Sequence, residues 1–85
     1  MTTAAVIVVE YTLTPDVPET PERLAHLKRC LAVREVTLLR SYSSLDGAKL
    51  VRVFEAPDAG AVRYAHASSG YTNVTVWAAE ERDTL

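Results

Sequence analysis

Cysteine is nearly absent from this chain of 85 residues, in which Cys30 is the only thiol. One cysteine cannot form a disulfide within the chain, so the sequence indicates a reducing, cytoplasmic setting. Glycine is also scarce, with three residues, and none of them belongs to a glycine-rich phosphate-binding loop. A domain of this size without disulfides gains little net stability from its core alone. We therefore expect association between copies to reinforce it.

Long apolar segments and an excess of basic charge are missing too. The longest apolar run, residues 4–9, is far too short to span a bilayer, and the charged start and cleavage site of a signal peptide are lacking. Nine basic and eleven acidic residues give a net charge of −2 without a basic stripe, which argues against nucleic-acid binding. We expect one domain over residues 1–85, with neither membrane nor nucleic acid as partner.

Four segments have the composition of β-strands. Residues 4–13 are rich in valine and isoleucine and are apolar at both alternating positions, as is typical of a central strand. Asp46 and Gly47 form a strong hairpin-turn signal, because both residue types tolerate positive φ. The expected strands are residues 4–13, 36–42, 49–55 and 73–79, so the core covers about 4–79 and a polar tail covers 80–85.

Two further segments carry helix signals. Thr20 and Pro21 suit the N-cap and the first helical position of a helix that ends near residues 32–34. Pro57 and Asp58 start a second helix, and Gly70 is placed to end it. The inner face of the first helix would consist of Leu24, Leu27, Cys30 and Leu31. The inner face of the second would consist of Ala61, Val62 and Ala65.

The predicted order is strand, helix, strand, strand, helix, strand. Right-handed crossovers fold this order into a four-stranded antiparallel sheet with both helices on one face, which is the ferredoxin-like βαββαβ arrangement of the α+β class. The other sheet face would be bare. The apolar content of the strands, including Val6, Val8, Val74 and Val76, exceeds what two short helices can cover. We expect a homodimer formed sheet against sheet, as in a dimeric α/β barrel.

Two segments also carry a family resemblance. Residues 38–47, L-L-R-S-Y-S-S-L-D-G, and residues 53–63, V-F-E-A-P-D-A-G-A-V-R, resemble small ferredoxin-like domains of unknown function, a family that includes a nickel-binding protein. The resemblance implies a dimeric α/β-barrel protein that binds a divalent metal, nickel, through His66 of the second helix. The chain departs from the pattern at residues 68–70, Ser-Ser-Gly, where the family often carries a second histidine.

A metal site needs several ligands that converge, and no H-x-x-x-H, C-x-x-C or E-x-x-H pair is present. The site would therefore be assembled from distant segments, with Glu10 of the first strand as a second ligand to the metal. His26 on the first helix is a weaker candidate because it lies among charged residues. On this reading the chain is a small dimeric nickel-type metal-binding protein.

Two other functions stay open at this point. One is a cofactor-free enzyme, cyclase-like or monooxygenase-like, acting on an aromatic or polyketide-like molecule with His66, Tyr42 and Arg40 as catalytic residues. Its ligand pocket would be lined by Tyr11, Arg52, Tyr64 and Trp77. The hairpin register decides whether Arg40 and Tyr42 share a sheet face with Val51 and Val53 or with Leu50, Arg52 and Phe54. The other function is a non-catalytic ligand-binding or structural accessory domain, in which the arginines pair with Glu10, Glu35 or Glu55.

Overall fold

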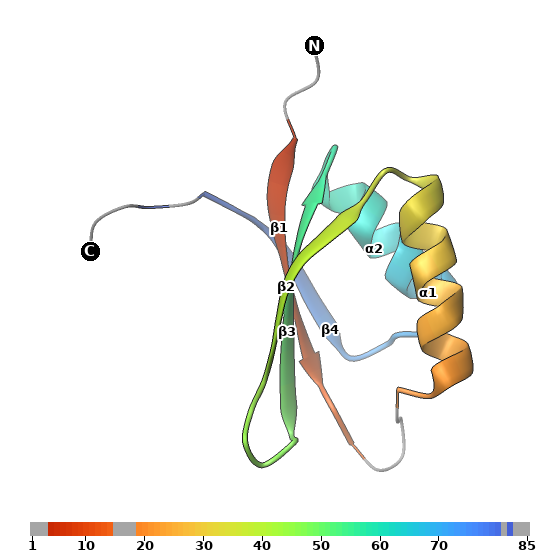
Figure 1. The fold of residues 1–85 in the computed structure, drawn as a ribbon, viewed down its shortest axis with the longest axis vertical. Coiled ribbons are helices and arrows are strands. Elements are labelled where there is room, and N and C mark those ends of the chain that lie inside the picture. Colours follow the sequence, from red (N-terminus) through yellow and green to blue (C-terminus); the bar gives the residue numbers. More distant parts are fainter. Residues whose placement is uncertain (1–3, 15–18, 81, 83–85) are drawn as a thin grey trace.

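The computed structural model describes residues 4–14, 19–80 and 82. Along the chain it contains β1 (Ala5–Thr12), α1 (Pro21–Val33), β2 (Thr37–Ser43), β3 (Lys49–Ala56), α2 (Ala59–Ser68) and β4 (Val74–Ala79). The strands form one antiparallel sheet in the order β2-β3-β1-β4, and both helices lie on the same side of it (Figure 1). The predicted ferredoxin-like fold is confirmed. Neither helix of the described part combines the length and the apolar character needed to cross a membrane.

α1 begins at the predicted Pro21, whereas α2 begins at Ala59, just after the predicted Asp58, which is its N-cap. The hydroxyl of Thr20 accepts a hydrogen bond from the backbone N–H of Arg23 at 3.1 Å, and the carboxylate of Asp58 accepts one from Ala61 at 2.8 Å. Each cap satisfies one of the backbone donors that a helix N-terminus leaves without an intrahelical partner. After α2 the chain turns through Gly70 at φ 83°, the left-handed conformation that glycine adopts without steric cost.

A turn joins β2 and β3 at the predicted place, but of the two predicted turn residues only Gly47 has positive φ. The backbone N–H of Gly47 donates to the carbonyl of Ser44, and side chains complete the turn. Asp46 accepts hydrogen bonds from the Ser44 hydroxyl at 2.6 Å and from the backbone N–H of Ala48 at 2.9 Å. The Ser44 hydroxyl in turn accepts from the backbone N–H of Lys49. Gly47 has φ 77°, as the turn signal requires. These local bonds set the hairpin.

A buried core fills the space between the helices and one face of the sheet. The strand residues that point toward the helices alternate with residues that point away, so β3 reads as buried at every second position from Leu50 to Ala56. The buried apolar residues are Ile7, Val9, Tyr11, Leu27, Leu31, Val36, Leu50, Phe54, Ala56, Val62 and Ala65. Val74 and Val76 of β4 pack against this core as well, so these two do not belong to the bare face, contrary to the prediction.

A register shift in β2 decides which face its side chains take. Leu38 pairs with Phe54, but the next paired residue is Arg40, opposite Val53, so Leu39 is an extra residue of the kind found in a β-bulge. After the shift Tyr42 pairs with Val51. Arg40 and Tyr42 therefore lie on the face away from the helices, together with Val51 and Val53.

Candidate functional site

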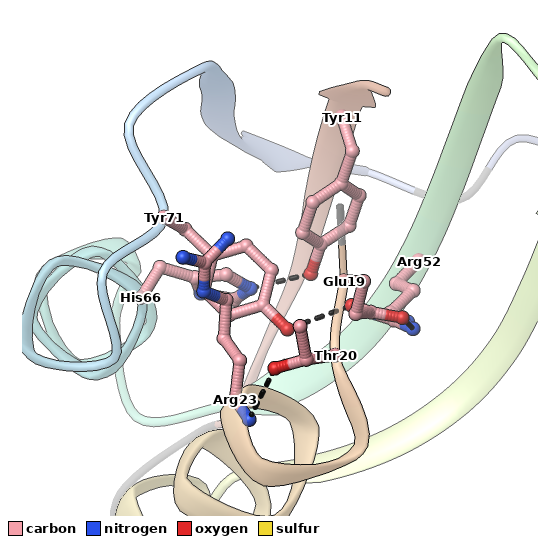
Figure 2. Close-up of polar contacts among 7 residues, drawn as sticks. All are labelled: Tyr11, Glu19, Thr20, Arg23, Arg52, His66 and Tyr71. Atoms are coloured by element: carbon pink, nitrogen blue, oxygen red, sulfur yellow. Dashed lines mark hydrogen bonds and ion pairs between the residues drawn. The ribbon is translucent and has the colours of Figure 1, made fainter. Parts of the chain in front are cut away.

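A network of polar side chains lies in the interior, between the helices and the covered sheet face (Figure 2). Its centre is Arg52 of β3, which is 8% exposed. Its two terminal nitrogens Nη1 and Nη2 donate to the two carboxylate oxygens of Glu19, both at 2.6 Å. The hydroxyl of Tyr71 donates to the same carboxylate at 2.7 Å. A bidentate arginine–carboxylate pair is among the strongest polar contacts in proteins, and here it also neutralises a buried charge.

Aromatic rings enclose this ion pair. The guanidinium carbon of Arg52 lies 4.9 Å from the ring centroid of Tyr11, and the guanidinium carbon of Arg23 lies 5.8 Å from that of Tyr71. The rings of Tyr11 and Tyr71 are themselves in edge contact, with 5.7 Å between their centroids. The attraction between a cation and an aromatic face is stronger when the cation is removed from water. The two tyrosine rings therefore stabilise the guanidinium groups as well as shield them from solvent.

His66 of α2 closes the network on its other side and is fully buried. Its Nδ1 lies 2.8 Å from the carbonyl oxygen of Val62, which can only accept, so Nδ1 carries the proton. Its Nε2 therefore accepts, and the partner is the hydroxyl of Tyr11. Both ring nitrogens are engaged, and the ring packs edge-on against Phe54 and Tyr71.

Burial and pairing shift the pKa values of the ionisable groups around the ion pair. Hydrogen bonds from Arg52 hold the pKa of Glu19 below its ordinary value, and burial lowers the pKa of His66. Burial raises the pKa of Tyr11 to about 12, and burial together with the bond to Glu19 raises the pKa of Tyr71. At neutral pH the network thus contains one ion pair, one neutral imidazole and two neutral phenols.

The network is complete and closed. Within the described residues every buried side-chain nitrogen or oxygen has a hydrogen-bond partner. The hollow beside it, at Tyr11, Glu19 and Tyr71, has a volume of about 20 Å³, which is the space of a single water molecule. A substrate has no room there, and no group is left over to act on one. The network therefore holds distant segments of the chain together and does not have the features of a reaction centre.

The predicted metal site is not formed. His66 lies on the helical side of the sheet, whereas Glu10 pairs with Val51 and Thr75 on the opposite face. The lone pair of His66 Nε2 is taken by Tyr11, so the imidazole has no free ligand position. Across the part of the chain that the structure describes, no group of three or more histidine, cysteine, aspartate or glutamate side chains converges. The prediction of a metal-binding protein is wrong for these reasons.

The predicted catalytic residues are not brought together either. Arg40 and Tyr42 lie on the face of the sheet that points away from the helices, the open face, and the sheet separates them from His66. Of the predicted pocket residues, Tyr11 and Arg52 meet in the interior network. Trp77 points to the open face and donates from its indole nitrogen to Glu10 at 3.1 Å. Tyr64 is 59% exposed on α2, with Arg34 stacked on its ring at 4.1 Å.

Glu19 and Tyr71 are the site residues that the sequence pattern did not reveal. Arginine in a strand signals that a partner exists, because an unpaired buried charge is very costly. The candidates considered for that partner were Glu10, Glu35 and Glu55, all in or beside strands. The true partner, Glu19, lies between Pro18 and Pro21 in the segment before α1, and no local spacing connects it with residue 52.

The face of the sheet that points away from the helices is the main apolar surface. We call it the open face, defined by Val6, Val8, Leu39, Tyr42, Val51, Val53 and Trp77. These residues come from all four strands and are half-buried or exposed, with Tyr42 at 55% and Trp77 at 44%. A hollow of about 380 Å³ lies on it, bordered by Val6, Leu39 and Val53 and also by the charged residues Arg40 and Glu80. Apolar patches with polar residues at their edge are common at interaction sites, so this face is the candidate binding surface.

Comparisons with known proteins show the fold and no more. No protein-family model matches the chain, and no curated protein matches it. A similar solved structure is the P2 domain of the chemotaxis kinase CheA, in complex with the response regulator CheY, from the thermophile Thermotoga maritima. The TM-score is 0.69 at 12% sequence identity, and the match covers 91% of this chain and 100% of that chain. At such low identity the likeness establishes the ferredoxin-like fold alone.

The comparisons also correct two expectations. The ferredoxin-like part of the predicted resemblance agrees with the fold, but no family model assigns the chain to the family with a nickel-binding protein. The predicted partners, a second copy through the sheet faces and a small-molecule ligand, are at odds with the solved structure, in which the similar domain is in a complex with a different protein, CheY.

Proposed function

We propose that this chain is a non-catalytic docking domain that binds another folded protein through the open face of its sheet. The observation that carries the proposal is the apolar open face itself, to which all four strands contribute. Trp77 and Tyr42, which lie toward opposite edges of the sheet, supply the large amphipathic side chains that dominate binding at many protein interfaces.

The interior supports a binding role over a catalytic one. The ionisable groups whose pKa values are shifted by burial lie in the closed network, where each already has a partner. An acid or base used on a substrate must reach the atom from which it takes or to which it gives a proton. The side of the sheet that carries the open face combines apolar side chains with the exposed charged residues Glu10 and Arg40, and this mixture suits contact with another protein surface.

The size of the open face favours a reversible complex. Four strands spaced about 4.8 Å apart, each contributing about six residues at about 3.4 Å, span roughly 400 Å². A standard stable interface buries about 800 Å² on each partner, so contact through this face alone would be of the weak and transient class. Transient contacts are typical of signalling proteins rather than of permanent assemblies.

We take the proposed class of binding partner from the solved structure that resembles this chain. The CheA P2 domain is in complex with a response regulator, so a response-regulator receiver domain is the first partner that we propose for this chain. A cytoplasmic location belongs to the same proposal. The fold alone does not carry this choice of partner, because one fold serves many functions.

The test is direct binding of purified receiver domains from the same organism to the full chain, measured by calorimetry. We expect saturable one-to-one binding to at least one of them. Replacing both large open-face side chains, Tyr42→Ala with Trp77→Ala, should weaken that binding at least about tenfold, since such side chains are typical hot spots.

The matched control is Tyr64→Ala, which removes an aromatic side chain of similar exposure from the helical side of the molecule. It should leave the affinity within about twofold of the original, as expected for a residue outside the interface. Binding to no receiver domain, or equal loss in both variants, would contradict the proposal. Sedimentation of the chain alone as a stable dimer would contradict it as well, because a second copy would then cover the open face.

A further inference from the structure

A second apolar surface lies on the other side of the sheet from the open face. It is a groove of about 220 Å³ between α1, β2 and β3. One wall is formed by Leu24, Leu27 and Leu31, spaced so that they share one face of α1. The opposite wall is formed by Leu38 and Phe54, which are paired in the sheet.

α1 packs against α2. On the strand side of the groove, the side chain of Leu38 belongs to the helical side of the sheet, as does that of its pairing partner Phe54, and Leu38 is nevertheless 50% exposed. The groove therefore has room for an additional apolar group beside Leu38.

Among the described residues, the two charged side chains that line the groove, Lys28 and Arg52, are both basic. Lys28 lines it, at a position between Leu27 and Leu31 where an apolar residue would continue the stripe of the helix. Lys28 forms no ion pair with any described residue. Arg52 also lines the groove, but Glu19 already neutralises it. The residues that border the groove include no acidic side chain.

We propose that this groove receives one large apolar side chain flanked by carboxylates, presented by a short acidic segment of a partner protein. The volume suits an aromatic or branched aliphatic side chain, because a cavity of about 150 Å³ is enough to hold benzene. The ammonium group of Lys28 at the border supplies the charge complementarity that orients such a segment. This site is separate from the open face and does not depend on the receiver-domain partner proposed above.

The test uses the peptide acetyl-Gly-Glu-Phe-Glu-Gly-amide, titrated into the ¹⁵N-labelled full chain and followed by NMR chemical shifts. We expect saturable shifts confined to the amides of α1 and of residues 36–38 and 52–54. Three control ligands separate the apolar contribution to binding from the charged one. The peptide with alanine in place of phenylalanine and the peptide with lysine in place of both glutamates should bind at least about tenfold more weakly. The neutral compound N-acetylphenylalanine amide should bind as weakly.

Two substitutions locate the site. Lys28→Glu should weaken the binding of the acidic peptide at least about tenfold, because like charges would then face one another. Arg29→Glu is the matched control, since Arg29 is an exposed neighbour on α1 that does not line the groove and the change in net charge is the same. Ala32→Phe places a ring at the exposed groove border without opening the core, and it should reduce binding to a similar extent.

Several outcomes would overturn the inference. Equal binding of the lysine peptide or of the neutral compound would mean that the groove takes apolar groups without regard to charge. Shifts on the open face, or equal effects of Lys28→Glu and Arg29→Glu, would place the peptide elsewhere. Concentration-dependent shifts of the same groove amides without peptide would assign the groove to a second copy of the chain. The double variant Tyr42→Ala with Trp77→Ala should titrate normally, so failure of the receiver-domain proposal and failure of this one are distinguishable.

Discussion

At the scale of single residues, Arg52 poses the main energetic problem of this domain. Burial alone would lower its pKa, but its hydrogen bonds to Glu19 raise the pKa above the ordinary value, so the guanidinium stays charged. A buried charge of this kind is tolerated only when a partner and further hydrogen bonds offset its desolvation. Glu19, which lies 33 residues from Arg52 along the chain, is the partner of the guanidinium. Tyr71, which lies 52 residues from Glu19, donates a further hydrogen bond to the Glu19 carboxylate.

Glu19→Gln tests this dependence. The amide keeps the shape and can still accept a hydrogen bond, but it leaves the positive charge of Arg52 without a counterion. We expect the free energy of unfolding to fall by about 3 kcal/mol, which is the usual cost of breaking a buried ion pair from one side. Urea unfolding followed by circular dichroism measures the change.

Glu55→Gln is the control for that substitution. Glu55 lies on the same strand as Arg52 but is exposed, so the same chemical change should alter the stability by no more than about 0.5 kcal/mol. If Glu19→Gln is as mild as Glu55→Gln, the interior ion pair does not hold the domain together in the way that its geometry indicates.

At the scale of helices and strands, local signals were sufficient for most of the fold. Thr20 is predicted as a helix cap, Pro57 and Asp58 as a helix start and Asp46-Gly47 as a turn, because each acts on the backbone within a few residues. The β2 bulge at Leu39 and the groove beside Leu38 are not predictable in this way. Both depend on how distant segments pack, and the bulge decides which face carries Tyr42.

The same limit applies to the candidate site. Tyr11 and Arg52 were predicted to line a pocket, and the structure brings them together, although in a closed network. Their partner Glu19 follows a proline-rich stretch and gave no periodic signal. His66 is predicted as a metal ligand on the strength of the family resemblance. Sequence does not distinguish an exposed histidine from a buried one, and here the contacts of both ring nitrogens show that His66 belongs to the interior network.

The connection between α1 and β2 contains a residue in a strained backbone conformation, Glu35, and a substitution can relieve that strain. Glu35 adopts φ 59°, a left-handed conformation that is unfavourable for residues with a side chain. Glu35→Gly should therefore increase the free energy of unfolding by about 0.5–1 kcal/mol, and Glu35→Val should decrease it, since β-branched residues fit this conformation worst. Thr37→Gly, at an exposed position in the extended strand β2, is the control and should destabilise the domain. A loss of stability in Glu35→Gly would show that this turn is not strained.

At the scale of the whole molecule, the net charge of −2 produces little general repulsion, so the interior network should dominate the dependence of stability on pH. His66 faces Tyr11, Phe54 and Tyr71 at close range, and Arg52 and Glu19 act on it through their charges. In the folded protein the pKa values of His66 and Glu19 are lowered, whereas those of Tyr11 and Tyr71 are raised. Protonation of the unfolded chain in acid and its deprotonation in base should both weaken the fold.

We expect the stability to be highest and nearly flat between about pH 6.5 and pH 10, the ordinary values for histidine and tyrosine. Below pH 6.5 the unfolded chain binds a proton at His66 while the folded chain does not, so stability falls by at most about 1.4 kcal/mol per pH unit for this group. Below about pH 4.5 Glu19 adds a second loss. Above pH 10 the unfolded tyrosines ionise before Tyr11, whose folded pKa is about 12, and stability falls again.

Urea unfolding between pH 4 and pH 11 measures this profile, and a pair of histidine variants assigns its acid side. His66→Gln keeps a polar group in the network but removes the titration, so the slope between pH 6.5 and pH 5 should disappear even though the variant is less stable at every pH. His26→Gln, at the exposed histidine of α1, should preserve that slope. A wild-type profile that stays flat to pH 5, or a slope that only His26→Gln removes, would show that the buried imidazole does not control the acid stability of the domain.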